Sequence, residues 1–334
     1  MKRVYNEYDV MKVLLLILVV VAHVTRMYTP QGAIPVYGYN EWLFMMTDYI
    51  YSFHMPAFIA VSGMTFSMSM KKRTSKDYLK LGGVKNKFQR LMIPYICFSI
   101  VVVLPTMLYT GCANIDDGII GYIFKSYVLA LDSRHLWYVY VLFELSVFFM
   151  FFYVFSNRHP AITLCILLGL FACSYLLPRI FLLNTFGYYA IFFFFGIIVI
   201  RQRVFLEKIK DIRVILCLFI ISVMLMRVKG YLPQTAVKLI AGLNGILMVY
   251  GVSCHLFKVG MARYNLFQKV CKNSYGIYLF HPMVIYLLYY WALPYHINSW
   301  ALSMAVFIIT SFVSYNATTI VRLSRWKFVI GEKY

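Results

Sequence analysis

A lysine and a histidine stand in the first apolar run of the chain, which extends from Tyr8 to Tyr28. Lys12 and His23 are eleven residues apart, so on an α-helix they share one face, about 16 Å apart along the axis. An ionisable group inside a membrane is costly unless it is partnered, and it is a candidate functional group by default. The imidazole could serve as a general base and the cation could bind a phosphate. A snorkelling Lys12 and a structural, hydrogen-bonded His23 are the alternative.

Two further histidines stand beside prolines inside apolar runs. His54 precedes Pro56, and His281 directly precedes Pro282, with Tyr278 one helical turn earlier. Proline removes a backbone donor and distorts a helix, so each pair predicts a distorted span with a polar side chain at the distortion. We interpret both histidines and the tyrosine as candidate substrate-binding residues. A histidine beside a purely structural kink is the alternative.

The apolar run near residues 136–155 has polar residues at its start and an acid within it. Arg134, His135 and Trp137 lie at its entrance and are candidate substrate-binding residues, although an aromatic belt at the membrane surface would also explain Trp137. Glu144 is surrounded by leucine and phenylalanine, so its carboxyl should be protonated or paired. It could orient a catalytic imidazole, or it could join neighbouring helices by hydrogen bonds.

A basic segment from Lys71 to Arg90 ends in two cations one helical turn apart, Lys87 and Arg90. Cationic side chains on one face at a membrane surface can bind phosphates. Together with Lys12, these two are candidate donor-binding residues if a nucleotide-bearing donor binds from the cytoplasm. A loop that is basic only for topological reasons is the alternative.

Composition indicates a polytopic membrane protein. Hydrophobic residues make up 62% of the 334 residues and charged residues 13%, and the mean hydropathy is +0.74. The net charge of +20 is divided among short segments between apolar runs, which argues against a nucleic-acid-binding face. The seven cysteines are scattered without CxxC spacing, so we expect neither a disulfide framework nor a metal site.

The apolar runs predict an all-α membrane helix bundle of about ten transmembrane helices. They lie near residues 11–29, 44–67, 91–111, 136–155, 161–177, 188–200, 214–226, 237–257, 274–292 and 300–321. Placing both termini in the cytoplasm puts most of the 32 Lys and Arg residues on the inner side, as the positive-inside rule requires. A shorter apolar segment at 118–131 predicts an interfacial or re-entrant helix on the outer side. We expect residues 1–334 to form a single membrane-embedded domain.

Five pieces of the sequence together resemble the acyltransferase-3 family of integral membrane O-acyltransferases, and within it the fucose 4-O-acetylase-like branch. They follow one another in the family's order. They are Lys12 with His23, FHMPAFIAVSG from Phe53 to Gly63, the basic segment that continues into RLMIPY, HLWYVYVLFE, and SYGIYLFHP.

The resemblance implies that an acyl group, usually acetyl from cytoplasmic acetyl-CoA, is passed to a sugar hydroxyl of a glycan at or beyond the outer membrane face. It implies that His23 matches the family's essential first-span histidine and Lys12 its basic partner. The family's paired arginines before the third span correspond to Lys87 and Arg90, so a lysine replaces the first arginine here. Many relatives append an extracytoplasmic esterase-like domain, and we expect the membrane domain of this chain to complete the transfer itself.

We therefore expect an O-acetyltransferase of the inner (cytoplasmic) membrane that acts with acetyl-CoA, a glycan acceptor and the lipid bilayer, without nucleic acid, and with His23 and Glu144 as catalytic residues. A secondary transporter or flippase is the second interpretation, because proline-interrupted spans with buried ionisable groups also describe carriers. A scaffold without activity is the third. Acetyl transfer by the purified protein would distinguish an enzyme from the other two.

Overall fold

The computed structural model describes residues 4–34, 36, 39–71, 82–228 and 230–332, and these residues form helices, turns and loops without any strand. The all-α fold class is therefore confirmed. The chain divides into two compact units. Unit 1 contains Met1–Ser67, Phe192–Tyr275 and Ile297–Phe307, and unit 2 contains Met68–Ile191, Gly276–His296 and Ile308–Tyr334. A single domain over residues 1–334 stays a prediction.

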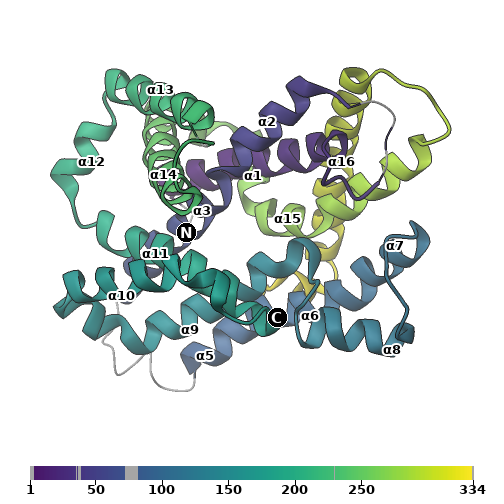
Figure 1. The fold of residues 1–334 in the computed structure, drawn as a ribbon, viewed down its shortest axis with the longest axis horizontal. Helices are drawn as coiled ribbons and strands as arrows, with labels where there is room; N and C mark the ends of the chain where they lie inside the picture. The colour runs from purple at the N-terminus through teal and green to yellow at the C-terminus, as the bar shows by residue number, and fades with distance from the viewer. Residues whose placement is uncertain (1–3, 35, 37–38, 72–81, 229, 333–334) are drawn as a thin grey trace. The chain divides into compact units, whose positions relative to one another are not determined.

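Unit 1 is built around α1, Glu7–Thr25, which contacts α2, Glu41–Tyr51, and α14, Gln234–Lys258 (Figure 1). A capping box starts α1, because the Asn6 side chain accepts from the backbone N–H of Asp9 and the Asp9 carboxylate accepts from the N–H of Asn6. The other elements that begin in this unit are η1 (Arg26–Tyr28), α3 (His54–Lys71), α12 (Arg203–Ile209), α13 (Ile212–Val228), η8 (Met261–Arg263), α15 (Asn265–Ala292) and α16 (Ser299–Leu323).

The first elements that begin in unit 2 form an unbroken helical stretch from Gly82 to Tyr109. It consists of α5 (Gly82–Lys87), η2 (Phe88–Met92), α6 (Ile93–Phe98), η3 (Ser99–Val103) and α7 (Leu104–Tyr109). The remaining elements that begin here are α8 (Gly118–Ile123), η4 (Phe124–Val128), η5 (Arg134–Leu136), α9 (Trp137–Arg158), α10 (Pro160–Ala172), η6 (Ser174–Leu176), η7 (Ile180–Leu182), α11 (Leu183–Val199) and η9 (Lys327–Ile330).

Two π-helical turns in the Gly82–Tyr109 stretch have a proline as their cause. The π turns η2 and η3 end two residues before Pro94 and Pro105. Proline offers no N–H to the carbonyl four residues earlier, so an α turn would leave that carbonyl without its bond. A π turn lets the carbonyl reach the N–H five residues on. The helix therefore continues through both prolines.

The ten apolar runs predicted from the sequence all fall on helices. The run at 44–67 is divided between α2 and α3, with the break at Ser52 and Phe53. A proline disturbs a helix at the carbonyl four residues before it, and Ser52 is four residues before Pro56. The position of the predicted distortion is therefore confirmed. The segment at 118–131 is also helical, as α8 and η4.

Six helical segments among the described residues are long and apolar enough to cross a membrane. They are Glu7–Tyr28, Gly82–Tyr109, Arg134–Arg158, Ile180–Val199, Gln234–Lys258 and Ser299–Leu323. These segments indicate a multi-pass membrane protein. The count of about ten spans and the cytoplasmic position of both termini stay predictions.

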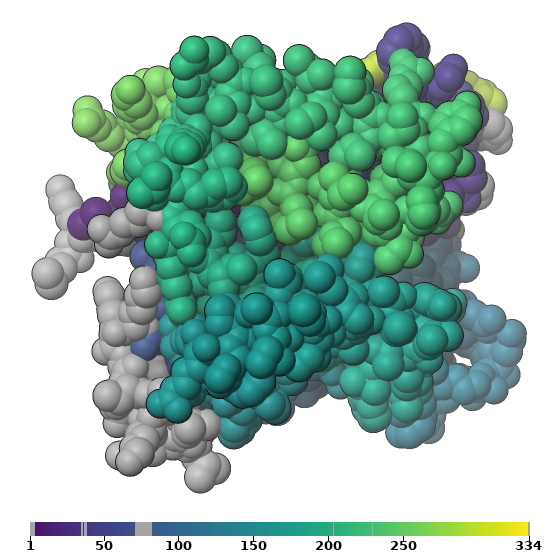
Figure 2. All heavy atoms as spheres, turned by 60° about the vertical axis from the view of Figure 1, so that its left-hand side comes forward, coloured from purple at the N-terminus to yellow at the C-terminus, as the bar shows by residue number. Residues whose placement is uncertain are grey.

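Apolar side chains cover the exposed face of α13, which lies at the surface of unit 1 (Figure 2). Leu216, Phe219 and Met224 are about half exposed or more, at 54%, 48% and 61%. A helix that is apolar on its outer face is typical of contact with lipid. The same helix packs its other face against α14.

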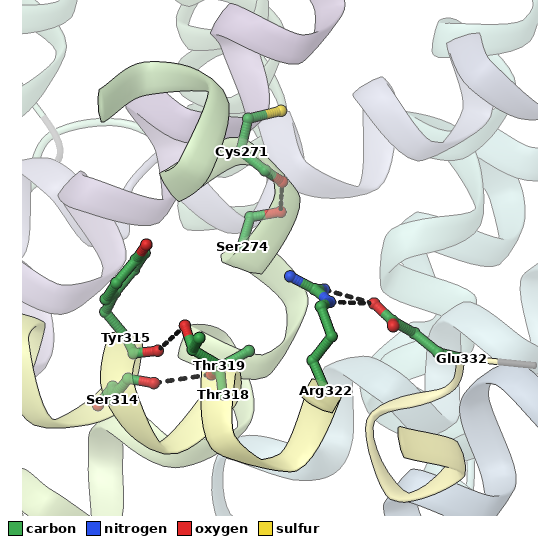
Figure 3. Close-up of polar contacts among 8 residues, drawn as sticks. All are labelled: Cys271, Ser274, Ser314, Tyr315, Thr318, Thr319, Arg322 and Glu332. Atoms are coloured by element: carbon green, nitrogen blue, oxygen red, sulfur yellow. Dashed lines mark hydrogen bonds and ion pairs between the residues drawn. The ribbon is translucent and has the colours of Figure 1, made fainter. Parts of the chain in front are cut away.

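Hydroxyl side chains in the second half of α16 bond back to the helix itself. Thr318 Oγ1 donates to the Ser314 carbonyl at 2.7 Å, and Thr319 Oγ1 donates to the Tyr315 carbonyl at 2.9 Å (Figure 3). Within unit 2, Gly276 allows close approach to Thr318, whose Cγ2 would lie 2.3 Å from a Cβ at that glycine. At the end of α16, Arg322 Nε donates to Glu332 Oε1 at 2.7 Å, which ties the segment after the helix back to it (Figure 3).

Two glycines in unit 1 bring α3 and α11 into backbone contact. A Cβ added at Gly63 would lie 2.1 Å from the Phe193 carbonyl oxygen, and one added at Gly196 would lie 2.1 Å from the Ala60 carbonyl oxygen. Real Cβ atoms essentially never lie this close to another heavy atom, so a side chain at either glycine would force the two helices apart. Small residues at such crossings let membrane helices approach closely.

Candidate functional site

The helix α1 carries Lys12 and His23 without interruption. Because α1 has no break between the two positions, eleven residues separate them by about 16 Å along the axis, and they differ by only about 20° around it. Both side chains are half-buried, whereas Ile17, on the other side of α1, is 42% exposed. The shared face of Lys12 and His23 is therefore partly covered by the rest of unit 1.

An aromatic side chain that the sequence analysis did not identify lies between two of the predicted site histidines. The ring of Tyr51 is centred 6.3 Å from the ring of His23 and 4.8 Å from that of His54, the latter edge to face. Arg26 Nη1 donates to the Tyr51 hydroxyl at 3.1 Å, and the guanidinium is 5.2 Å from the ring centre. His23, Tyr51, His54 and Arg26 thus form one cluster, the first-helix cluster. Each new member is three residues from a predicted one, which is the spacing that could have indicated it.

His54 has a structural contact that also fixes its tautomer. Its Nδ1 lies 2.7 Å from the Ile50 carbonyl oxygen, at the break between α2 and α3. Because a carbonyl oxygen only accepts, Nδ1 carries the proton, and in the neutral ring Nε2 is the acceptor. The ring is 1% exposed. His54 therefore stabilises the helix break, and its predicted contact with a substrate stays a prediction.

In unit 2, two hydrogen bonds join His135 to α15, one donated by each partner. His135 Nε2 donates to the Leu279 carbonyl at 3.1 Å, and the Tyr278 hydroxyl donates to the His135 carbonyl. The remaining ring atom, Nδ1, is buried and has no hydrogen-bond partner. These bonds fix η5, which contains Arg134, and the start of α9 at Trp137.

His281 compensates for the proline that follows it. Pro282 cannot bond to the Tyr278 carbonyl four residues earlier, and His281 Nδ1 lies 2.8 Å from that oxygen instead. The His281 ring is fully buried, 6.1 Å from the ring of His135. His135, Tyr278 and His281, three of the predicted substrate-binding residues, thus lie together, but through contacts that a structural role explains.

Replacing Tyr278 with phenylalanine should lower the thermal stability of the protein. The change removes one hydrogen bond and leaves the buried His135 carbonyl unsatisfied, which costs about 1–3 kcal/mol. The midpoint of thermal unfolding in detergent measures the effect. Tyr295→Phe is the matched control, because Tyr295 lies in the same unit and is 65% exposed. Equal midpoints for the two variants would refute the role of this bond.

Glu144 and the cations near the third predicted span lie on helices of unit 2 that contact each other, and the rings of Phe88 in η2 and Phe143 in α9 are centred 6.1 Å apart. Glu144 lies inside α9, and its Oε2 is buried without a hydrogen-bond partner. Such an unsatisfied oxygen in a native structure is typical of a strained or functional group. Lys87 is half-buried at the end of α5, and Arg90 is exposed in η2, which contacts α9. The roles predicted for these three residues stay predictions.

Arg134 and Trp137 line a cavity of about 550 Å³ in unit 2. Its wall comes from three segments: residues 131–137, residues 174–175 and residues 182–189. The Trp137 and Tyr189 rings are stacked with their centres 5.0 Å apart. Arg134 is held by Asp132, with Nε 3.2 Å from Oδ2, and by a 2.7 Å bond from Nη2 to the Cys112 carbonyl. His135 is not among the residues that line this cavity.

Strained backbone surrounds the same cavity. Four non-glycine residues in the described ranges have positive φ, namely Ala130 at 56°, Arg134 at 47°, Phe181 at 54° and Leu182 at 56°. Arg134 and Leu182 line the cavity, and the other two are next to lining residues. The Phe181 N–H donates to the Leu129 carbonyl at 2.7 Å and joins the two strained segments. Backbone strain of this kind is concentrated at functional sites.

No group of three or more His, Cys, Asp or Glu side chains that could hold a metal ion occurs among the described residues. The model of the acyltransferase-3 family, described as an acyltransferase domain, matches residues 5–319 of the chain. No curated protein and no solved structure matches the chain significantly.

Proposed function

Because the chain belongs to the acyltransferase-3 family of membrane acyltransferases, we propose that it is an O-acetyltransferase. It would move an acetyl group from cytoplasmic acetyl-CoA to a hydroxyl of a cell-surface glycan or of its lipid-linked precursor. We place it in the inner (cytoplasmic) membrane with both termini in the cytoplasm. Membership of the family favours transfer over the carrier and scaffold interpretations. The observation that supports the proposal most is the unbroken α1, with Lys12 and His23 on one half-buried face.

The spacing on α1 suits a donor that enters from one side of the membrane. A cation at the cytoplasmic end of the helix can bind a phosphate of coenzyme A. The pantetheine arm is extended and roughly as long as the distance from Lys12 to His23, about 16 Å. The thioester would then lie near the imidazole. Lys87 and Arg90 are further candidates for phosphate contacts, because both precede the third predicted span on its predicted cytoplasmic side.

The chemistry assigned to His23 is general base catalysis. The imidazole takes the proton of the acceptor hydroxyl while that oxygen attacks the thioester carbonyl carbon. A carbon–oxygen ester bond forms, the carbon–sulfur bond breaks, and the thiolate of coenzyme A leaves and is protonated. Direct acylation of His23 is the alternative route through the same side chain.

The other members of the first-helix cluster would position this base. Tyr51 is fixed by the hydrogen bond from Arg26 and lies beside the rings of His23 and His54. A fixed aromatic neighbour restricts the rotation of an imidazole and so preorganises it for proton transfer. We assign Tyr51 and Arg26 as positioning residues.

The proposal is tested by adding acetyl-CoA labelled in the acetyl group to the purified protein in lipid nanodiscs with glycan acceptors. Release of coenzyme A that depends on the acceptor, and label in the glycan, are the expected results. Comparison of glycan O-acetyl content in cells with and without the gene identifies the natural acceptor. A protein that is folded and neither hydrolyses nor transfers acetyl would refute the proposal.

Replacing Arg90 with glutamine should weaken the binding of acetyl-CoA. The loss of one charge-assisted phosphate contact costs about 1.5–3 kcal/mol, which is roughly a 10- to 150-fold rise in Kd. Isothermal titration with purified protein measures the change. Lys85→Gln is the matched control, because Lys85 is an exposed cation five residues earlier in the same helical stretch. An unchanged Kd for the Arg90 variant would remove this residue from the donor site.

A further inference from the structure

The cavity in unit 2 has the composition of a carbohydrate site. Six of its lining side chains are polar, four are aromatic and two are leucine; they are Asp132, Ser133, Arg134, Ser174, Asn184 and Thr185, then Trp137, Tyr175, Tyr188 and Tyr189, then Leu131 and Leu182. A lipid chain would leave the polar half of this wall without partners, which is unfavourable. Sugars present both hydroxyl groups and apolar C–H faces, so they match a wall of polar and aromatic side chains. The volume of about 550 Å³ lies within the range of small-molecule sites.

We propose that this cavity binds a neutral sugar of the acceptor glycan, with Trp137 and Tyr189 as the stacking surface and Asn184 and Thr185 as hydrogen-bonding groups. The inference rests on the proposed function only for the identification of the bound sugar as the acyl acceptor. All three cavity segments follow or precede spans on the predicted outer side, which is the side from which a cell-surface glycan would arrive.

The charges in the wall select for a neutral ligand. Arg134 and Asp132 are paired at 3.2 Å, so their charges largely cancel within the cavity. The guanidinium is also held by the Cys112 carbonyl, which limits its rotation toward a ligand. An isolated arginine would favour uronic acids, and an isolated aspartate would favour amino sugars. The Arg134–Asp132 pair favours neither uronic acids nor amino sugars.

The stacking surface is held rigidly by two sets of contacts. Trp137 lies against Tyr189 with an interplanar angle of 25°, and the adjacent Tyr188 packs on Phe171 with ring centres 4.9 Å apart. The hydrogen bonds between His135 and α15 also fix the residues directly before α9. Sites held by such supporting contacts bind with little loss of conformational entropy.

The test measures binding of methyl glycosides to the full-length protein in nanodiscs by saturation-transfer NMR titration. The probes are methyl glucoside, galactoside, mannoside and fucoside, with glucuronic acid and glucosamine as charged probes. We expect at least one neutral glycoside to bind more tightly than both charged probes. Trp137→Ala should weaken that binding about tenfold or more, because it removes an aromatic anchor, while Trp137→Phe should retain most of it.

Trp326→Ala is the matched control, since Trp326 belongs to the same unit, is 56% exposed and does not line the cavity. Thermal unfolding of each variant confirms that it is folded. Binding that is unchanged in both Trp137→Ala and Asn184→Ala would overturn the proposal, as would the absence of binding by every neutral glycoside. The labelled-acetyl assay separates the two proposals: transfer with an unchanged acceptor KM in Trp137→Ala refutes the cavity alone, whereas glycoside binding without any transfer refutes the enzyme alone.

Discussion

Replacing His23 with alanine is expected to lower the rate of acetyl transfer by about 10²- to 10⁴-fold, the usual contribution of a general base. The protein should still insert, because alanine in an apolar helix is at least as favourable as histidine. Binding of acetyl-CoA should also be retained, since Lys12 lies about 16 Å away along α1. A variant with normal donor affinity and turnover lowered by this factor is impaired in the chemical step alone.

The measurement is acceptor-dependent release of coenzyme A by the purified variant, together with the O-acetyl content of the glycan in cells. His255→Ala is the matched control, because His255 is an exposed histidine near the end of another helix, α14. Addition of free imidazole should restore part of the activity of His23→Ala if the site admits it. Wild-type glycan O-acetylation by a normally inserted His23→Ala protein would refute the mechanism and leave His23 a structural residue.

Replacing Gly63 with leucine should destabilise the protein by about 3 kcal/mol or more, because overpacking a helix crossing forces the backbones apart. The Cβ alone would lie 2.1 Å from the Phe193 carbonyl oxygen, so Gly63→Ala should already lower stability. Gly196→Ala should have a similar effect, since its Cβ would meet the Ala60 carbonyl oxygen at the same distance. We expect the leucine variant to be lost or aggregated on extraction.

Gly169→Leu is the control for this result. Gly169 also stands within a helix, α10, so the intrinsic gain in helix propensity is the same as at Gly63. A Cβ there meets no heavy atom within 4 Å. Size-exclusion profiles and unfolding midpoints of the detergent-solubilised variants give the comparison. Equal behaviour of Gly63→Leu and Gly169→Leu would show that α3 and α11 do not pack as described.

Local patterns were sufficient to predict where the helices lie. The apolar run at 11–29 corresponds to α1 and η1, and its earlier start at Glu7 follows from the capping box of Asn6 and Asp9, which an apolar pattern does not contain. The run at 44–67 was predicted as one span distorted by Pro56, and the structure divides it at Ser52 and Phe53, just before that proline. The π turns η2 and η3 were not predicted, although Pro94 and Pro105 mark them.

The candidate site could be predicted only in part, because its contacts join distant segments. Ionisable residues inside apolar runs are rare, so Lys12, His23 and Glu144 were conspicuous. Tyr51 and Tyr189 were not conspicuous, because aromatic residues make up 19% of the chain and nothing in the sequence distinguishes these two from the others. Asn184 and Thr185 belong to the cavity through tertiary contacts alone. The tautomers of His54 and His281 likewise depend on carbonyl groups that only the folded backbone brings within reach.

The positive φ angles around the cavity have a consequence for how this protein can change under selection. Left-handed backbone costs about 1–3 kcal/mol at each non-glycine residue, so Ala130, Arg134, Phe181 and Leu182 together cost about 4–12 kcal/mol, comparable with the whole net stability of a typical domain. Away from the cavity wall the chain uses glycine for this conformation, at Gly111, Gly118, Gly260 and Gly331. Glycine at the four cavity positions would make the protein more heat-resistant but would loosen the wall. Homologues from hot environments that act on a different acceptor are therefore expected to differ first at these four positions. Those that act on the same acceptor are expected to retain the strained residues.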